Sequence, residues 1–396
     1  MRILFLTHRL PYAPNRGDRI RAYHLLRTLA TFSQVTLFSL VHDDDEASHV
    51  GDLSAWTDAV HVARVPVWRN RLLAAPALLT GRPMTHVLLD APGLVRQVGN
   101  VAETVSPDVV FAYCSGMARL ATAPQLDRRP LVHDMVDVDS AKWAALADRT
   151  SGPLAAVYRR EARVLGRFEH QVTERARLTL VVNDREHATL DAIAPGTRIE
   201  TLENGVDVDY FSPSGPPVQT PTAVFTGILN YAPNEDAAYW LLRDIWPRVL
   251  GQLPSARVTI VGAGASQALI AEAAKVQGAS VTGAVADVRP YLHQAAISVA
   301  PLRTARGLQN KVLEALAAGL PVVTTSAVAE GLPPQVLGGC RVADDADSMA
   351  AAILTLFRQS ADNRRMLASR AGVDRLSWQR QLARLPDLLR AVLDGR

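Results

Sequence analysis

The residues best suited to chemistry lie between positions 298 and 331, where polar side chains precede a helix and a carboxylate follows one turn later. The polar side chains are Arg303, Arg306, Asn310 and Lys311. The amides and the dipole of a helix N-terminus already favour an anion, and the basic side chains would add to this attraction. Glu314 can accept hydrogen bonds from two hydroxyl groups. This combination suits a nucleotide sugar, with its diphosphate on the bases and its ribose on the acid.

A strand, a loop and a helix are needed to hold these side chains together. Residues 297–300 form an apolar strand, and the helix after the loop carries an apolar stripe. The stripe consists of Val312, Leu313, Leu316 and Ala317. Gly319 is expected to end the helix as a left-handed cap, and residues 321–325 form a second buried strand. We therefore predict a strand–loop–helix–strand unit of a parallel sheet.

Strand and helix patterns alternate along the chain, which predicts an α/β protein with doubly wound sheets. In the first half, strands are expected at 3–6, 35–40, 108–113, 130–134 and 178–182, and helices at 19–32 and 153–177. In the second half, strands are expected from 223 onward and at 258–261, 279–282, 298–300 and 322–325. A single final helix is expected from Trp378 to Val392. We predict an N-terminal domain at 1–203, a linker rich in Asn, Gly and Pro at 204–222, a C-terminal domain at 223–375 and a terminal helix at 376–396.

Length and composition limit the classes of protein that need to be considered. A chain of 396 residues with 48% hydrophobic and 20% charged residues has material for two soluble cores. The formal net charge is only +3 and the arginines are scattered, so no nucleic-acid partner is expected. Cys114 and Cys340 are expected to be buried thiols in a reducing compartment. Because no signal peptide or bilayer-length apolar run is visible, we expect a cytoplasmic protein, at most peripheral on the inner face of the cytoplasmic membrane.

The segment around Lys311 also resembles a known signature of the form PLR…G…K…EA. The matching residues are Pro301, Leu302, Arg303, Gly307, Lys311, Glu314 and Ala315. This pattern is similar to the donor-binding signature of family-4-type glycosyltransferases, and more narrowly of the sugar transferases associated with exosortase-linked exopolysaccharide loci. The resemblance implies a GT-B fold, in which two Rossmann-like doubly wound domains face a central cleft and the C-terminal helix crosses back to the N-terminal domain.

The same resemblance implies an activity and its partners. A sugar would move from a UDP- or GDP-sugar, with retention of configuration and without a cofactor or metal, to a polysaccharide or a lipid-linked saccharide. The donor-binding residues would be Gly17, Gly227, Gly283, Val285, Arg303, Gly307, Asn310, Lys311 and Glu314. The catalytic residues would be His133, Asp134, Arg303 and Lys311, with the first two on the acceptor side.

This chain departs from the family pattern at three positions. Many relatives carry a second glutamate seven residues before the one at Glu314, where this chain has Arg306. Many also carry an Arg and a Lys at the positions of Ile228 and Asn234. We therefore expect Lys311 and Arg303 to hold the diphosphate together. A catalytically silent GT-B subunit that binds another transferase, and a nucleotide-sugar epimerase of the same fold, are the alternatives.

Two further segments have competing interpretations. Asp137 and Asp139 form a DxD, the metal–diphosphate motif of the GT-A fold, but the GT-B resemblance argues against a metal, and Asp139 or Ser140 is expected to cap a helix at Ala141. Residues 68–85 mix arginines with leucines. They fit either a helix on a membrane surface or an ordinary buried helix with Pro76 at a kink.

Overall fold

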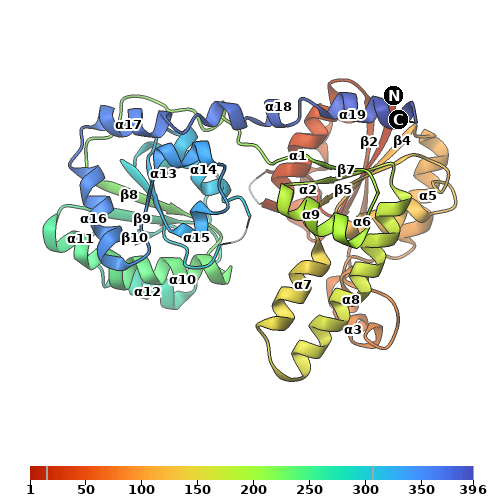
Figure 1. Cartoon of the computed structure of the whole chain (residues 1–396), viewed down its shortest axis with the longest axis horizontal. Helices are drawn as coiled ribbons and strands as arrows, with labels where there is room; N and C mark the ends of the chain where they lie inside the picture. The colour runs from red at the N-terminus through yellow and green to blue at the C-terminus, as the bar shows by residue number, and fades with distance from the viewer. Residues whose placement is uncertain (15–16, 306, 396) are drawn as a thin grey trace. The chain divides into compact units, whose positions relative to one another are not determined.

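The computed structural model of the chain describes residues 1–14, 17–305 and 307–395 (Figure 1). It divides into two compact units. The first contains Met1–Asn204 and Gln381–Arg396, and the second contains Gly205–Arg380. Each unit is built on its own parallel sheet, as the alternating pattern predicts.

The described residues of the first unit form a seven-stranded parallel sheet with the strand order β3-β2-β1-β4-β5-β6-β7. The strands are β1 (Arg2–Thr7), β2 (Gln34–Val41), β3 (Ala59–Arg64), β4 (Val109–Tyr113), β5 (Leu131–Val136), β6 (Leu178–Val181) and β7 (Ile199–Thr201). The order reverses between β1 and β4, as in doubly wound folds. The central strands are buried along almost their whole length, because helices cover both faces of the sheet.

The described part of the first unit contains ten α-helices. They are α1 (Gly17–Ala30), α2 (Asp44–Ser48), α3 (Val67–Ala77), α4 (Met84–Leu88), α5 (Leu94–Val105), α6 (Ser115–Ala118), α7 (Asp139–Asp148), α8 (Gly152–Arg175), α9 (Asp184–Ile193) and α19 (Leu385–Leu393). Short 3-10 turns lie at His49–Leu53 and Arg119–Thr122. In Figure 1, α7 and α8 project from the sheet as a hairpin and α3 lies near α8.

The described residues of the second unit form a six-stranded parallel sheet with the order β10-β9-β8-β11-β12-β13. The strands are β8 (Thr222–Thr226), β9 (Arg257–Val261), β10 (Ala279–Val281), β11 (Ile297–Ala300), β12 (Val322–Thr324) and β13 (Cys340–Val342). This is the order of the first six strands of the other sheet, with the reversal now between β8 and β11.

Helices lie on both sides of the second sheet (Figure 1). They are α10 (Ala232–Trp240), α11 (Trp246–Gln252), α12 (Gln267–Ala274), α13 (Arg289–His293), α14 (Asn310–Ala317), α15 (Ser326–Ala329), α16 (Ala346–Phe357), α17 (Ala361–Ser369) and α18 (Trp378–Gln381). A π-helical turn at Leu241–Ile245 joins α10 to α11, and 3-10 turns lie at Pro334–Gly339 and Val373–Leu376. Gly319, with a φ of 80°, follows α14 in the predicted left-handed conformation.

Two features of the secondary structure differ from the sequence prediction. The predicted final helix is broken, since α18 ends at Gln381 and α19 begins at Leu385. Pro386 has no N–H to bond to the carbonyl of Leu382, which interrupts the helical ladder there. Strands β3, β7 and β13 were also missing from the prediction. All three are edge strands, and they are either largely exposed or only three residues long.

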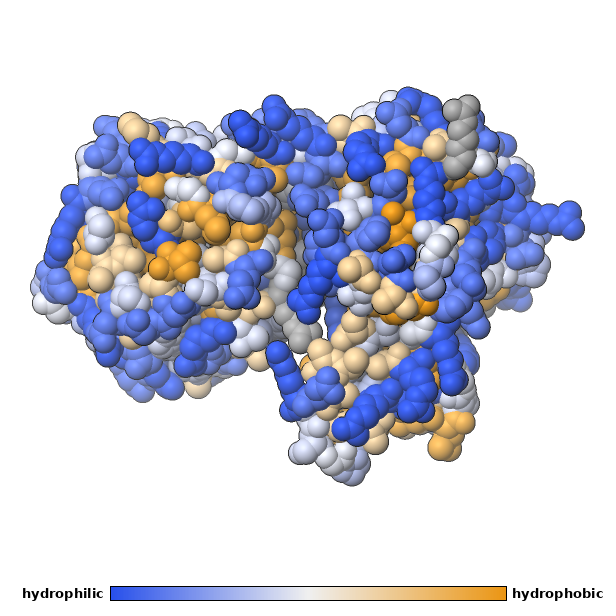
Figure 2. Space-filling view, in the orientation of Figure 1, coloured by the Kyte–Doolittle hydropathy of each residue, from blue (hydrophilic) through white to orange (hydrophobic). Residues whose placement is uncertain are grey.

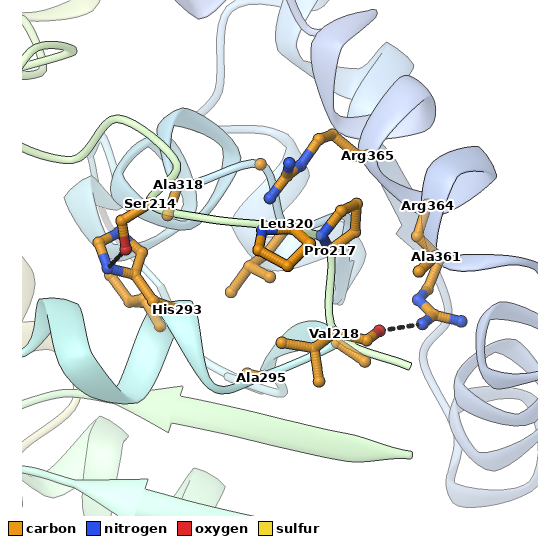
Figure 3. A pocket seen from close by; sticks show the side chains of 14 residues that line it. Ser214, Pro217, Val218, His293, Ala295, Ala318, Leu320, Ala361, Arg364 and Arg365 are labelled. Atoms are coloured by element: carbon orange, nitrogen blue, oxygen red, sulfur yellow. Dashed lines mark hydrogen bonds between the residues drawn. The ribbon is translucent and has the colours of Figure 1, made fainter. Parts of the chain in front are cut away.

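The segment that follows the boundary between Asn204 and Gly205 packs on the second unit (Figure 3). Arg364 donates a hydrogen bond to the carbonyl of Val218, and Arg365 donates one to the carbonyl of Gly215. The cavity left between these groups measures about 20 Å³. Such a space holds about one water molecule, so it is a packing defect and not a substrate site.

Candidate functional site

The strand order of the second sheet places two loops side by side. Strand β8 ends at Thr226 and β11 ends at Ala300, and the two strands are parallel neighbours. The loops at 227–231 and 301–309 therefore leave the sheet at the same edge. Open α/β sheets bind their ligands at this edge, where the strand order reverses.

Lys311 reaches from the start of α14 to the loop after β8. Its Nζ donates a hydrogen bond of 2.6 Å to Oδ1 of Asn234, and the Asn234 Nδ2 donates one of 2.9 Å to the carbonyl of Ile228. The ammonium group lies 4.8 Å from the centre of the Phe225 ring. A Cβ added to Gly227 would lie only 2.9 Å from Nζ. The ammonium is therefore held directly against the main chain of Gly227.

Asn234 has a role that its sequence position does not reveal. Asn234 stands where many relatives have a lysine. In the structure it accepts the hydrogen bond that orients Lys311. The two residues are 77 positions apart, so no local motif connects them. Lysine carries three N–H donors, and among the described residues only Asn234 takes one of them.

The loops after β8 and β9 form a wall made largely of main chain. The amide of Gly227 donates to the carbonyl of Val261, and the amide of Leu229 donates to the carbonyl of Ala263. A Cβ added to Gly262 would lie 1.7 Å from the carbonyl oxygen of Gly227. The glycine at position 262 thus allows the loops after β8 and β9 to approach closely, and the GxG sequence at 262–264 forms a tight turn.

The first turn of α14 presents unsatisfied polar groups. Among the described residues, no side chain caps this helix, and the Oδ1 of Asn310 is buried without a hydrogen-bond partner. Glu314 is half-buried, and burial raises the pKa of its carboxyl group to about 7. Burial also lowers the pKa of Lys311 to about 8, against the opposing effect of the Glu314 charge. Helix amides, an ammonium and a carboxyl group are therefore gathered within one turn.

Arg303 is paired with a carboxylate of α10, and its joint action with Lys311 on a diphosphate stays a prediction. Its guanidinium binds the carboxylate of Asp236 on α10, with Nε 3.1 Å from Oδ2, and lies over the ring of Trp240. The side chain remains about half exposed. Arg306, which stands where relatives have a glutamate, lies outside the described residues.

The remaining predicted donor residues lie at the same edge of the sheet. Gly307 has a φ of 62°, and a Cβ on Gly331 would lie 2.4 Å from its carbonyl oxygen. The loop after β11 is thus packed against the turn after α15. Gly283, with a φ of 73°, follows β10, and Val285 packs on the hydrophobic core of the unit.

The two predicted acceptor-side residues of the first unit are completely buried. Asp134 forms an ion pair with Arg21, at 2.9 Å between Oδ2 and Nε, and Arg21 also donates to the carbonyl of Leu202 and to Oδ1 of Asn204. Both ring nitrogens of His133 are buried and have no hydrogen-bond partner among the described residues. Burial lowers the pKa of His133 to about 4, so the ring is neutral at pH 7. This placement favours a structural role for both residues.

The DxD carboxylates are paired with a lysine. Lys142 lies 2.9 Å from Asp137 and 3.3 Å from Asp139, and Asp139 also accepts a hydrogen bond from Ser115. Among the described residues no group of three or more His, Cys, Asp or Glu side chains is placed to hold a metal ion. The expected cap is wrong, since α7 already begins at Asp139 and the hydroxyl of Ser140 bonds to Glu169 instead.

Gly17 is the first residue of α1 and is exposed. A Cβ added there would meet no atom within 4 Å, so the structure does not require glycine at this position. The nearby loop is held by a carboxylate of the chain itself. Glu46 accepts a hydrogen bond of 3.1 Å from the amide of Leu10 and lies 3.3 Å from Arg19.

A known family matches most of the second unit. Residues 220–359, which include the whole of the site around Lys311, match the family described as glycosyl transferases group 1. No curated protein matches the sequence significantly. The described helices include none with the length and apolar composition needed to span a bilayer.

Solved structures resemble the whole chain. Sucrose-phosphate synthase from Thermosynechococcus elongatus is 16% identical, with a TM-score of 0.71 and all of both chains covered. Anabaena HepE, solved in complex with UDP, is 16% identical, with a TM-score of 0.67 over 99% of this chain and 100% of its own. A glycosyltransferase from Rickettsia africae is 12% identical, with a TM-score of 0.65 over 100% of this chain and 99% of its own. The chain therefore has the GT-B fold, and residues 220–359 of its second unit match the family described as glycosyl transferases group 1.

Proposed function

We propose that this protein transfers a glycosyl group from a nucleoside diphosphate sugar to an acceptor hydroxyl. The observation that carries the proposal is the position of Lys311. Asn234 holds its ammonium at the reversal of the second sheet, beside the N-terminus of α14, which no described side chain caps. A departing diphosphate needs positive charge and N–H donors at one place, and both are available there.

The reaction breaks the bond between the sugar C1 and the β-phosphate oxygen and forms a bond from C1 to the acceptor oxygen. The negative charge that develops on the leaving diphosphate would be stabilised by the Lys311 ammonium and the amides of α14. In a retaining reaction the acceptor proton passes to a phosphate oxygen on the same face of the sugar. We propose retention and no metal requirement, since Lys311 and the amides can supply the charge that a metal would otherwise provide.

The ribose of the donor would bind Glu314, one turn along α14 from the phosphates. An ionised carboxylate accepts hydrogen bonds from both hydroxyls of a diol. The HepE structures contain UDP, UDP with glucose, and UDP-glucose, which supports a uridine donor over a guanosine donor for this chain. Asn310, whose buried Oδ1 has no hydrogen-bond partner among the described residues, would accept a further hydroxyl hydrogen bond from the donor.

For the acceptor we propose a saccharide of the exopolysaccharide type, carried on a lipid at the membrane surface. The support is the resemblance of the segment at 301–315 to the transferases of exosortase-linked loci. Such an acceptor would be bound by the first unit. His133 and Asp134 would not contact this acceptor, because both are buried and Asp134 is ion-paired with Arg21.

The test is to incubate the purified full chain with UDP-glucose, other UDP-sugars and GDP-mannose, with and without EDTA, and to measure release of free nucleotide. We expect UDP release from at least one UDP-sugar that persists in EDTA, and UDP binding detectable by calorimetry. A protein that binds UDP but never releases it from any UDP-sugar, with or without a lipid-linked acceptor, would be the silent subunit. Conversion of one nucleotide sugar into another without UDP release would identify an epimerase.

A further inference from the structure

Helix α3 exposes large apolar side chains and buries a polar one, which is the reverse of the usual arrangement. Trp68 and Leu72 are 72% and 68% exposed, whereas Asn70 is buried and donates to the carbonyls of Leu88 and Asp90. Leu79, in the turn after the helix, is 93% exposed. A helix that packs on a protein core buries its large apolar residues. The alternative of an ordinary buried helix is therefore wrong for this segment.

Hydrogen bonds from α8 fix the loop that exposes Leu79. Arg160 on α8 donates hydrogen bonds to the carbonyls of Ala77, Thr80 and Arg82, on both sides of Leu79. The carboxylate of Glu161 is fully buried and accepts hydrogen bonds from the amides of residues 84 and 85, each at 2.9 Å. Two adjacent side chains of α8 thus fix the loop in a shape that directs Leu79 outward.

The charges of the segment have one sign. Residues 67–82 contain three arginines and no acidic residue. Arg69 and Arg71 are exposed, and at helical spacing they flank the stripe made by Trp68 and Leu72. Neither forms an ion pair with another described residue. We call these four side chains together with Leu79 the α3 face. The α7–α8 hairpin and the neighbouring α3 project from the first unit. In Figure 2, hydrophobic and strongly hydrophilic surfaces lie side by side on the part of this projection where α3 and its loop lie.

We propose that the α3 face docks on an anionic lipid bilayer. Exposed Trp and Leu side chains suit the boundary between headgroups and acyl chains, where an indole ring is favoured. The two flanking arginines would bind anionic headgroups. A helix of 11 residues is too short to span the bilayer and would lie in the plane of the interface. Pairing of two copies through this face would bring the arginines of one against those of the other, which disfavours self-association. The proposal concerns a surface outside the donor site and does not depend on the transferase activity.

The test measures flotation of the full chain with vesicles of phosphatidylcholine, with and without phosphatidylglycerol. We expect binding to the vesicles that contain phosphatidylglycerol, and weakening by salt. Arg69→Gln should reduce the partition coefficient about fivefold. The double variant Trp68→Glu, Leu79→Glu should lose binding by more than about tenfold, because it removes the apolar anchor and adds repulsion.

The matched control is Met366→Glu, which alters an exposed apolar side chain (55%) of the second unit and should leave vesicle binding unchanged. The urea unfolding transition of the first unit, measured on every variant, reports whether that unit is folded and is expected to stay constant. Equal flotation of the double variant and the unmodified protein would overturn the proposal. So would a sedimentation-velocity dimer that disappears in Leu79→Glu while no vesicles are bound, since the α3 face would then be an interface between copies.

Discussion

The loops at the carboxyl edges of the two sheets have different hydrogen-bond partners for their amides. In the first unit, carboxylates of the chain itself occupy the loop amides. Glu46 accepts from the amides of Leu10 and His42, Glu186 from that of Val138, and Glu169 from that of Ser140. In the second unit, the loops after β8 and β9 bond to each other through main chain, and Lys311 lies beside them.

The two kinds of loop contact serve different purposes: those of the first unit stabilise the fold, and those of the second leave a position for a ligand. A carboxylate that satisfies an amide closes that position to any other anion, and its removal leaves buried donors unpaired. A wall of glycine main chain with a lysine beside it leaves room for an anion from solution. Edges with the same topology can therefore be either structural or available to a ligand, depending on whether the chain provides its own anion.

The largest expected effect is that of Gly262→Ala, which breaks the glycine wall. Its Cβ would lie 1.7 Å from the carbonyl oxygen of Gly227, so one of the two loops must move. We expect loss of detectable UDP binding by calorimetry, together with a lower unfolding temperature. Gly251→Ala is the control, because a Cβ there meets nothing within 4 Å, and it should be neutral or slightly stabilising. A Gly262→Ala protein with normal affinity for UDP would show that the wall does not shape the site.

The next effect in size concerns the first unit. Arg21→Ala leaves the buried carboxyl group of Asp134 without its partner, and burial already raises the pKa of that group. We expect the free energy of unfolding of the first unit to fall by about 3–5 kcal/mol in urea titrations. UDP affinity should be unchanged below the transition. Arg64→Ala, which removes an exposed ion pair with Asp44, should have no measurable effect. An Arg21→Ala protein as stable as the unmodified one would contradict the structural role.

Lys311→Ala tests whether the ammonium of the second unit binds an anion. Removal of a charge-assisted contact of about 1.5–3 kcal/mol should weaken UDP binding about ten- to a hundredfold by calorimetry. Lys275→Ala, at an exposed lysine of the same unit that pairs with Glu272, is the matched control and should not change the affinity. Equal UDP affinity in both variants would remove Lys311 from the site.

The pH dependence of UDP binding refines the same point. Lys311 has a lowered pKa of about 8, so its ammonium is present below that pH and is lost as the pH rises through it. We expect UDP affinity to decrease above about pH 8, toward the value of Lys311→Ala. The Lys311→Ala protein itself should lack this decrease. A decrease of the same size in the variant would assign the titration to another group.

The smallest effect is expected for Asp236→Ala, which releases Arg303 from its partner on α10. The pair is half exposed, so UDP affinity should change by less than about fivefold. An increase of more than about tenfold would show that Arg303, once free, turns to the diphosphate. Lys311 and Arg303 would then act together as the sequence predicts.

The central strands of both sheets could be predicted because they are buried on two faces and therefore form apolar runs. The edge strand β3 could not, since it carries His61 and Arg64 and buries only Ala63. The break before α19 was also missed, although Pro386 was a visible signal for it.

The candidate donor site could be assembled from the sequence where it occupies one contiguous segment. Gly307, Asn310, Lys311 and Glu314 precede or begin one helix, so local spacing is enough. The bond from Lys311 to Asn234 joins residues 77 positions apart and needs the tertiary fold. Arg303 is close to Lys311 in the sequence, but its side chain forms an ion pair with Asp236. Local spacing cannot reveal this pair.

The main-chain wall formed by Gly227 and Gly262 also matters for inhibitor design. A compound that bonds to its amides and carbonyls would meet the same groups in any protein with the same two glycines in this geometry, and would not distinguish between them. Selectivity has to come from side chains at the margin of the wall. Ile228, which is exposed, and Asn234, which holds Lys311, stand where this chain departs from the common pattern. A selective ligand for this protein would therefore place an apolar group on Ile228 and leave the Asn234–Lys311 bond intact.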